Sequence, residues 1–140
     1  MRWLAWTAVT FAMHFVWEMS QAKWFVGMAE LPFWTGTFLC LRASLGDIVI
    51  TAVAFVSAAA ASRTLLWPRL RRTLPFTMFM LVGLIITIAY EVFALRTGRW
   101  SYGPEMPTLF GIGLLPLLQW TIIPPIEVVI FRALWRRGPA

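Results

Sequence analysis

The sequence predicts an all-α polytopic membrane protein, a bundle of four transmembrane helices that forms a single domain over residues 1–140. Of the 140 residues, 60% are hydrophobic and only 13% are charged, which is too apolar for an ordinary soluble domain. The apolar residues fall into runs of about 20, the length that a helix needs to cross a bilayer. These runs are continuous, whereas a transmembrane β-barrel needs short alternating segments.

Four spans fit the hydropathy pattern, and short connections join them. We place the spans at residues 3–24, 43–67, 75–95 and 112–135. The third begins at Pro75, which is acceptable in a first helical turn. The stretches "GMAELPFWTGTFLC" and "TGRWSYGPEMPTLFGIG" are then loops at one end of the bundle. The single cysteine, Cys40, cannot form an internal disulfide.

The basic residues lie at the predicted helix ends, where they meet lipid headgroups, so the net charge of +6 does not indicate nucleic-acid binding. One end carries eight of them: Arg2, Arg63, Arg69, Arg71, Arg72, Arg132, Arg136 and Arg137. The other end carries four: Lys23, Arg42, Arg96 and Arg99. The positive-inside rule therefore predicts an integral protein of a bacterial inner membrane with both termini in the cytoplasm.

The two loops at the less basic end resemble each other. Each follows an aromatic–Glu pair on a helix, continues through a basic–Trp pair and ends in Glu-x-Pro-x-x-x-Gly. This pattern indicates a weak internal repeat of two parallel helical hairpins, related by an axis along the membrane normal. Chance similarity is the alternative, because Trp and Pro are common at membrane interfaces.

Four of the six acidic residues fall inside predicted spans, and this is the strongest functional signal in the sequence: Glu18, Asp47, Glu91 and Glu127. A charged side chain at the bilayer centre costs at least about 2.5–3.5 kcal/mol. At about 1.5 Å per residue, the first three acids and Gln119 share the outer half of the bundle, above His14. Glu127 lies deeper, and we expect it to pair with a cytoplasmic arginine.

The helical spacing supports an internal polar cavity. His14, Glu18 and Gln21 lie on one stripe of a helix, and Gln119 and Glu127 lie on another. We expect Glu18 to hydrogen-bond, directly or through one water, to His14, Asp47, Glu91 or Gln119. The alternatives are a purely structural pair of His14 with Glu18, and acids that reach the headgroups or pair with Arg42 and Arg96.

The chain resembles the EXPERA family, which includes sterol isomerases of the emopamil-binding-protein type. His14 and Glu18 match that family's His-x-x-x-Glu, Asp47 stands near its acid on the next core helix, and Trp120 with Pro124 matches its Trp-x-x-x-Pro. Leu117 replaces an Asn of the family pattern. The resemblance implies a four-helix core in which a carboxylic acid protonates an alkene and an aromatic ring stabilises the cation. A looser resemblance links the chain to integral-membrane terpene and carotenoid cyclases.

The leading hypothesis is a membrane isomerase or cyclase that acts on an isoprenoid or sterol-like lipid by acid–base chemistry at a C=C bond. An apolar site can keep one carboxyl protonated as an acid, a second carboxylate can take the proton back, and aromatic faces can stabilise a cation. We assign catalysis to Glu18 and Asp47 with His14 and Glu91 in support, and the pocket lining to Trp17, Tyr90, Gln119 and Trp120.

This chemistry needs no cofactor, and His14 with Glu18 offers too few ligands for a metal, in a chain with one histidine. The main alternative is a lipid- or pigment-binding accessory subunit of a larger membrane complex, in which His14 ligates a pigment or haem. A homo-oligomer fits either hypothesis. A proton- or cation-conducting pore is the third possibility. It would need polar residues along its whole depth, and Glu127 is the only acidic residue in the inner half of the bundle.

Overall fold

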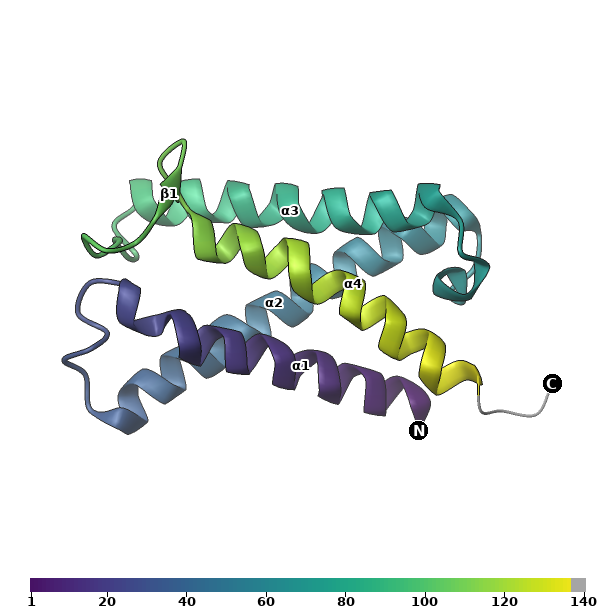
Figure 1. Ribbon diagram of the computed structural model, residues 1–140, viewed down its shortest axis with the longest axis horizontal. Coiled ribbons are helices and arrows are strands. Elements are labelled where there is room, and N and C mark those ends of the chain that lie inside the picture. Colours follow the sequence, from purple (N-terminus) through teal and green to yellow (C-terminus); the bar gives the residue numbers. More distant parts are fainter. Residues whose placement is uncertain (137–140) are drawn as a thin grey trace.

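The computed structural model describes residues 1–136 and is all-helical, as the sequence predicts. The main elements are α1 (Arg2–Gln21), α2 (Phe33–Ser62), α3 (Thr73–Arg96) and α4 (Leu114–Arg136) (Figure 1). The connections contain two short 3₁₀ helices, η1 (Ala22–Trp24) and η2 (Trp67–Leu70), and one small antiparallel pair, β1 (Thr108–Leu109) with β2 (Ile112–Gly113).

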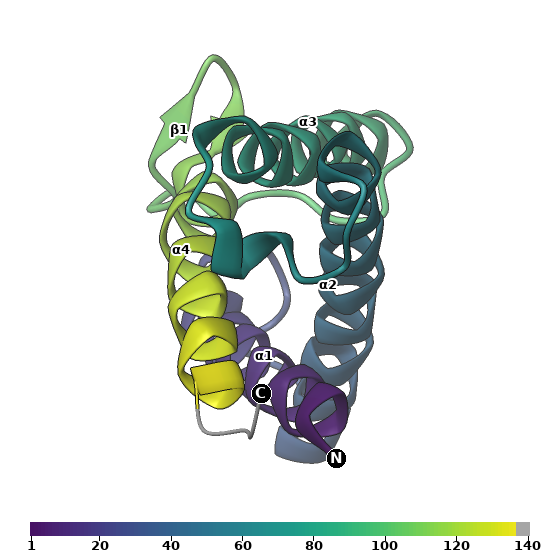
Figure 2. The same ribbon diagram turned by 90° about the vertical axis from the view of Figure 1, so that its right-hand side faces the viewer.

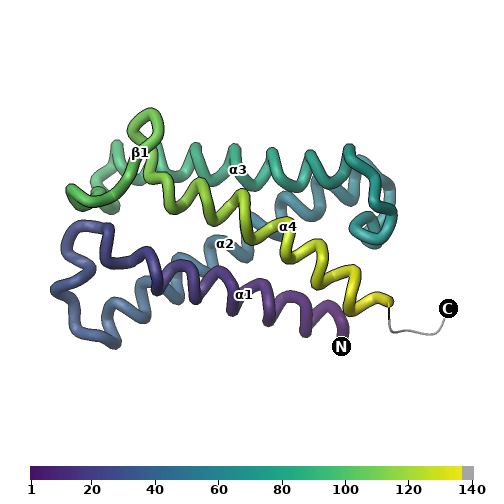
Figure 3. The backbone as a smooth tube through the Cα atoms, viewed as in Figure 1, coloured from purple at the N-terminus to yellow at the C-terminus, as the bar shows by residue number. Residues whose placement is uncertain are grey.

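The four helices form a closed ring. Each packs against the next one along the chain, and α1 also packs against α4. Figure 2 shows α1 opposite α3 and α2 opposite α4, which is the arrangement that a repeat of two parallel hairpins needs. The repeat itself stays a prediction. Figure 3 shows that the helices follow the long axis, with the N-terminus and the end of α4 at one end. We call this the terminal end, and we call the opposite end, with residues 22–32 and 97–113, the loop end.

The polarity of the bundle is that of a membrane protein. Three helices, α2, α3 and α4, are long and apolar enough to cross a membrane. Their outward faces carry exposed aliphatic residues such as Val53, Ile85 and Val129, while the buried positions include His14 and Glu127. In water, exposing so many apolar side chains would cost free energy, whereas in lipid it does not. The polar groups find hydrogen-bond partners inside the bundle.

The second helix starts earlier than predicted, at Phe33 and not at Ala43, directly after Pro32. The prediction was misled by Gly36, which we assigned to a loop but which lies in the first turn of α2. The 30-residue helix is about 45 Å long, well beyond the roughly 30 Å hydrocarbon core. Figure 1 shows α2 crossing the bundle obliquely, and a tilted helix spans a smaller thickness than its own length.

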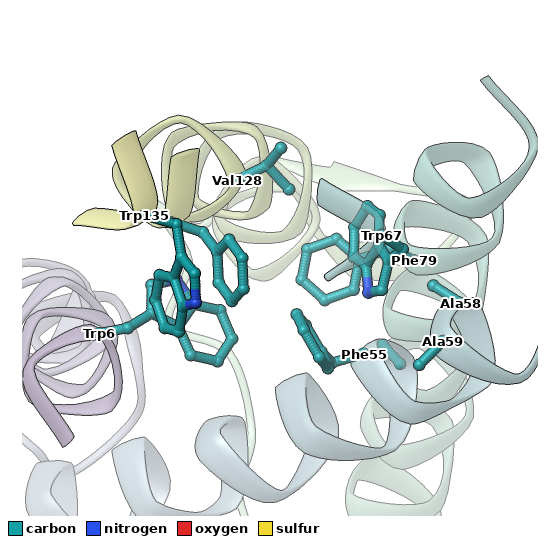
Figure 4. Close-up of a cluster of buried hydrophobic side chains, with 10 residues drawn as sticks. Trp6, Phe55, Ala58, Ala59, Trp67, Phe79, Val128 and Trp135 are labelled. Carbon is teal, nitrogen blue, oxygen red and sulfur yellow. The ribbon is translucent and has the colours of Figure 1, made fainter. Parts of the chain in front are cut away.

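An aromatic cluster fills the terminal end of the bundle (Figure 4). Its buried members come from all four helices and η2, and they include Trp6, Phe55, Trp67, Phe79 and Phe131. The rings of Phe131 and Trp135 stack with centroids 3.9 Å apart. Edge-to-face and stacked pairs of this kind add stability beyond the area that they bury. The cluster therefore closes the terminal end with tightly packed side chains.

The structure confirms the basic group at the terminal end, whereas Arg42, which we counted at the other end, lies inside α2, nine residues after its first residue. Arg63, Arg69, Arg71 and Arg72 lie between α2 and the start of α3, at the terminal end with Arg2. Arg132 lies near the end of α4 and donates a hydrogen bond to the carbonyl of Pro68. Arg137, which we counted with this group, lies outside the described residues.

Backbone pairing joins the two connections at the loop end. Phe25 and Tyr102 form an antiparallel bridge, in which the Val26 amide donates to Ser101 and the Gly103 amide donates to Trp24. A Cβ on Gly103 would lie 3.1 Å from the Trp24 carbonyl oxygen, so the close approach favours glycine here. The bridge ties the α1–α2 connection to the α3–α4 connection and so covers the loop end of the bundle.

The contact between α3 and α4 depends on Gly83, and this generates a prediction. A Cβ at Gly83 would lie 2.4 Å from the buried ring of Trp120, so that ring must move. We expect Gly83→Ala to lower the free energy of unfolding by about 1–3 kcal/mol, the usual cost of overpacking. Unfolding in detergent by heat or SDS measures it.

The matched control is Gly46→Ala, because Gly46 lies in α2 with open space around its Cβ position. That change should stabilise the helix by about 0.5–1 kcal/mol. Equal stability of the two variants would contradict the assigned packing of Trp120.

Candidate functional site

Inward-facing polar side chains from α1, α2 and α4 meet inside the bundle. We define the polar cluster as six residues: His14, Glu18, Gln21, Asp47, Gln119 and Glu127. Each follows the helical spacing that keeps side chains on one face, such as His14 and Gln21 on α1. All except Glu18 are buried, and Glu18 is half-buried. The predicted convergence of polar groups is therefore confirmed, although its membership differs from the prediction.

His14 is the centre of the cluster. Its side chain is fully buried, and both ring nitrogens have partners. Nε2 lies 3.1 Å from a carboxylate oxygen of Glu127. Nδ1 lies 2.8 Å from the amide nitrogen of Gln119 and 3.5 Å from a carboxylate oxygen of Asp47. One imidazole thus connects α1 to α2 and α4.

The bonds of Gln119 decide where the proton sits on the ring. Its amide nitrogen also lies 2.9 Å from the same Asp47 oxygen, to which it donates. When it donates to Nδ1 as well, that nitrogen must be an acceptor, so the ring proton is on Nε2 and is donated to Glu127. Turning the amide would reverse this pattern. The ring then donates from Nδ1 to the Gln119 oxygen, and both Asp47 and the Glu127–Nε2 pair need an additional proton. The first arrangement therefore needs fewer protons in the cluster.

Glu18 joins the cluster through Gln21. The Gln21 amide donates to Glu18 at 2.7 Å and to the Gln119 oxygen at 3.5 Å. Trp17 fixes Gln21 from the other side, because its indole nitrogen donates to the Gln21 oxygen at 3.2 Å. We expected Glu18 to bond, directly or through one water, to His14, Asp47, Glu91 or Gln119. The Gln21 amide makes this link to Gln119, because it bonds to both side chains.

Glu127 is the residue that the sequence reasoning placed wrongly. We expected it to pair with a cytoplasmic arginine, but it is fully buried against His14, and the nearby Arg132 bonds instead to Pro68. Counting depth along the helix axis ignored the reach of the Glu and His side chains. The spacing of Gln119 and Glu127, eight residues apart on one stripe of α4, was the signal that could have corrected it. Pro124 and Pro125 lie between them without ending the helix.

Glu91 belongs to a separate site at the loop end. It is buried, and it accepts hydrogen bonds from the Trp100 indole and the Tyr102 hydroxyl, both in the loop after α3. Burial, and then the bond to Glu91, raise the pKa of the Tyr102 hydroxyl above its usual value, so Tyr102 remains the donor. The predicted support of the catalytic pair by Glu91 is not seen, because its hydrogen bonds fasten the loop and do not reach the cluster.

The aromatic residues that we predicted to line a pocket separate into three positions. Trp120 is buried beside the cluster, with its ring centroid 5.6 Å from that of His14. Trp17 lies at the margin, half-buried. Tyr90 is 44% exposed, and its hydroxyl accepts from Arg99 on the outside of the bundle, so its assignment to the pocket was wrong.

In the described part of the chain, four buried polar oxygens have no hydrogen-bond partner, one from each helix: Thr10, Thr51, Thr87 and the second carboxylate oxygen of Glu127. Thr10 lies one helical turn before His14, and Thr51 lies one turn after Asp47. The sequence analysis did not single out these threonines. Buried hydroxyl and carboxylate oxygens of this kind are the usual partners of internal water or of a bound polar group. Within residues 1–136, no set of three or more His, Cys, Asp or Glu side chains is arranged to hold a metal ion.

Comparison with known proteins finds no relative of this chain. No protein-family model, no curated protein and no solved structure matches this chain significantly.

The burial of Glu127 generates a prediction about stability. Glu127→Ala removes the partner of His14 Nε2 and opens a gap beside a fully buried imidazole. Breaking a buried pair in this way should cost about 3–5 kcal/mol of unfolding free energy. Denaturation in detergent, followed by circular dichroism, measures the loss.

The matched control is Glu105→Ala, since Glu105 is exposed in the loop after α3. The free energy of unfolding of this variant should stay within about 0.5 kcal/mol of that of the original protein. A Glu127→Ala protein as stable as Glu105→Ala would contradict the buried pair.

Proposed function

We propose that the protein is a membrane enzyme that isomerises or cyclises an isoprenoid-like lipid by moving a proton at a C=C bond. The observation that supports this proposal is a chain of hydrogen bonds through the side-chain amides of Gln21 and Gln119, which we call the bridge. One carboxyl group lies at each end of it. Glu18 stands at the half-buried end of the bridge, and Asp47 stands at the end that contacts His14. Two carboxyls in such different surroundings suit different roles in proton transfer.

Glu18 is the proposed acid. Gln21 engages its Oε1 atom, which leaves the second oxygen to carry a proton towards the substrate. In the first step the O–H bond of Glu18 breaks and a C–H bond forms at one alkene carbon. The π electron pair supplies that bond, so the other alkene carbon becomes a cation. General acid catalysis of this kind contributes about 10²–10⁴-fold to a rate.

Asp47 is the proposed base. In an isomerisation it removes a proton from a carbon beside the cation, and the released C–H electron pair becomes the new double bond. In a cyclisation a second double bond first attacks the cation and closes the ring. Both steps leave Asp47 protonated and Glu18 ionised, so before the next turnover Asp47 must release its proton to water and Glu18 must take one up from water. Gln119 and His14 both contact Asp47 and so hold it in place for this exchange.

Trp120 and Trp17 are suited to the cation that forms between these steps. Trp120 is fixed beside the cluster by its burial against Gly83. Trp17 lies next to Glu18 in sequence and is held by its bond to Gln21. The face of an indole ring attracts a cation by about 0.5–2 kcal/mol, more where water is excluded. The resemblance of His14, Glu18 and Trp120 to the sterol-isomerase family pattern supports the same chemistry.

We further propose that all four helices cross the membrane, with both termini on the cytoplasmic side. Helix α1 has 20 residues, about 30 Å, which equals the thickness of the hydrocarbon core. It is less apolar than the other three because it carries His14 and Glu18, but these face the cluster and not the lipid. Its packing against both α2 and α4 supports a place within the same membrane layer.

The topology can be tested with reporter fusions. We expect reporters inserted at Gly27 and Gly98 to lie outside the cytoplasm, and reporters at Arg71 and after Arg136 to lie inside, because most basic residues gather at the terminal end. Paired alkaline phosphatase and green fluorescent protein fusions report the two sides. A cytoplasmic Gly27 together with a cytoplasmic Arg71 would mean that α2 does not cross.

The alternative functions find less support in the geometry. A haem or pigment ligand needs a free imidazole nitrogen, and both nitrogens of His14 are engaged by Glu127, Gln119 and Asp47. A continuous pore would have to pass the aromatic cluster, which fills the terminal end. An accessory subunit that binds lipid without changing it stays the main rival, and the next experiment separates it from an enzyme.

Solvent deuterium provides the test of catalysis. In D₂O the proposed acid carries a deuteron, so each turnover leaves one C–D bond in the lipid. We expect mass spectrometry to find deuterium in lipids that copurify with the protein or in added squalene and geranylgeraniol. Glu18→Gln keeps the bond with Gln21 but has no proton to give, so incorporation should fall by about 10²–10⁴-fold.

The control is Glu30→Gln, since Glu30 is exposed in the connection between α1 and α2. It should incorporate deuterium at the original rate. Equal incorporation by folded Glu18→Gln and Glu30→Gln would remove Glu18 as the acid. Bound lipid without any deuterium in the original protein would favour the accessory subunit.

A further inference from the structure

We infer that a pocket between α1 and α2 at the loop end seats the apolar end group, about six carbons in size, of the lipid on which Glu18 acts. Its role as a substrate site rests on the proposed function, whereas the binding of an apolar group does not. Met19 lines it from α1, Ala22 from the start of η1, and Gly36 and Cys40 from α2. The connection between these helices, in purple and blue at the loop end of Figure 1, contributes Met28 and Leu31.

The size of the pocket selects the ligand. Its volume is about 160 Å³. An engineered apolar protein cavity of about 150 Å³ binds benzene, so this pocket, which is open on one side, has room for a cyclic or branched group of about six carbons. A whole isoprenoid chain is several times larger and must lie mostly outside, along the apolar helix faces. The pocket therefore takes one end of a lipid and not its full length.

The lining selects for apolar chemistry. Apart from Thr37 the side chains are aliphatic, aromatic or sulfur-containing, and the Thr37 hydroxyl donates to the backbone carbonyl of Phe33. Burying a polar ligand group there would cost free energy, since the lining leaves few polar partners for it. The two methionines add flexible, polarizable side chains, which adapt well to apolar ligands of irregular shape.

The residues that line the pocket lie near Glu18 along the first helix and near Asp47 along the second. Met19 follows Glu18 directly in α1, and Ala22 follows it by four residues, one helical turn later at the start of η1. On α2, Cys40 begins the buried stripe that continues through Ser44 to Asp47. An end group in the pocket would thus place the next double bond of its chain beside Glu18 and Asp47.

Gly36 makes the test possible without touching the acids. It lines the pocket, and a Cβ at this position meets no atom within 4 Å, so a leucine side chain here has room to enter the cavity. Gly46 is the matched control, because it lies in the same helix with equally open space but outside the pocket lining. Gly36→Leu should fill the site, whereas Gly46→Leu should leave it open.

The experiment uses cyclohexene, a six-carbon alkene, as the probe of the purified protein. A ligand that binds only the folded state raises the unfolding temperature. We expect cyclohexene to raise it in the original protein and in Gly46→Leu but not in Gly36→Leu. Cyclohexene should also slow the reaction of Cys40, the only cysteine, with methyl methanethiosulfonate in the first two proteins alone. An equal temperature shift in both variants, or no shift in any protein, would overturn the inference.

Deuterium incorporation separates this inference from the proposed function. Both glycine variants keep Glu18 and Asp47, so a working enzyme with a filled pocket should lose most incorporation in Gly36→Leu and keep it in Gly46→Leu. Cyclohexene binding without incorporation in the original protein would support the pocket and contradict the catalysis. Incorporation that persists in Gly36→Leu would contradict the pocket as the substrate site and leave the catalysis standing.

Discussion

The arrangement of the bundle depends on one buried imidazole. His14 lies between Glu127 on one ring nitrogen and Gln119 with Asp47 on the other. In a membrane the lipid tails are as apolar as the helix surfaces, so apolar contact alone gives helices little reason to prefer one partner over another. Polar groups that have no partner in lipid supply that preference. The contacts of His14 therefore fix how α1, α2 and α4 meet, and the other features of the site follow from this.

The bundle divides into two ends with different chemistry. At the terminal end the aromatic cluster packs rings from every helix and η2. At the loop end Glu91 holds Trp100 and Tyr102, and the bridge of Phe25 with Tyr102 covers the helix ends. The polar cluster lies between these two closures. The lipid substrate that we propose would therefore reach it from the side, between helices.

The sequence predicted the class of fold and most members of the cluster, because both depend on patterns within one helix. Hydropathy found the four helices, and the spacing of His14 with Gln21 found the inward face of α1. Contacts between helices were harder to predict from the sequence. Depth counting placed Glu91 with the cluster and Glu127 apart from it, and the structure reverses both assignments. The start of α2 was missed, since we assigned the stretch up to Cys40 to a loop, whereas the helix already begins at Phe33 after Pro32.

Burial separates the residues that hold the bundle from those free to react. His14, Gln119 and Glu127 are at most 2% exposed and bond across helices, so their loss must disturb packing as well as any chemistry. Glu18 is different, because it is half-buried and its bond goes to Gln21 on its own helix. A carboxyl with one committed oxygen, at the edge of a rigid network and beside an apolar pocket, can exchange a proton without breaking a contact between helices. The same network that makes His14 indispensable for the fold thus leaves Glu18 available for chemistry.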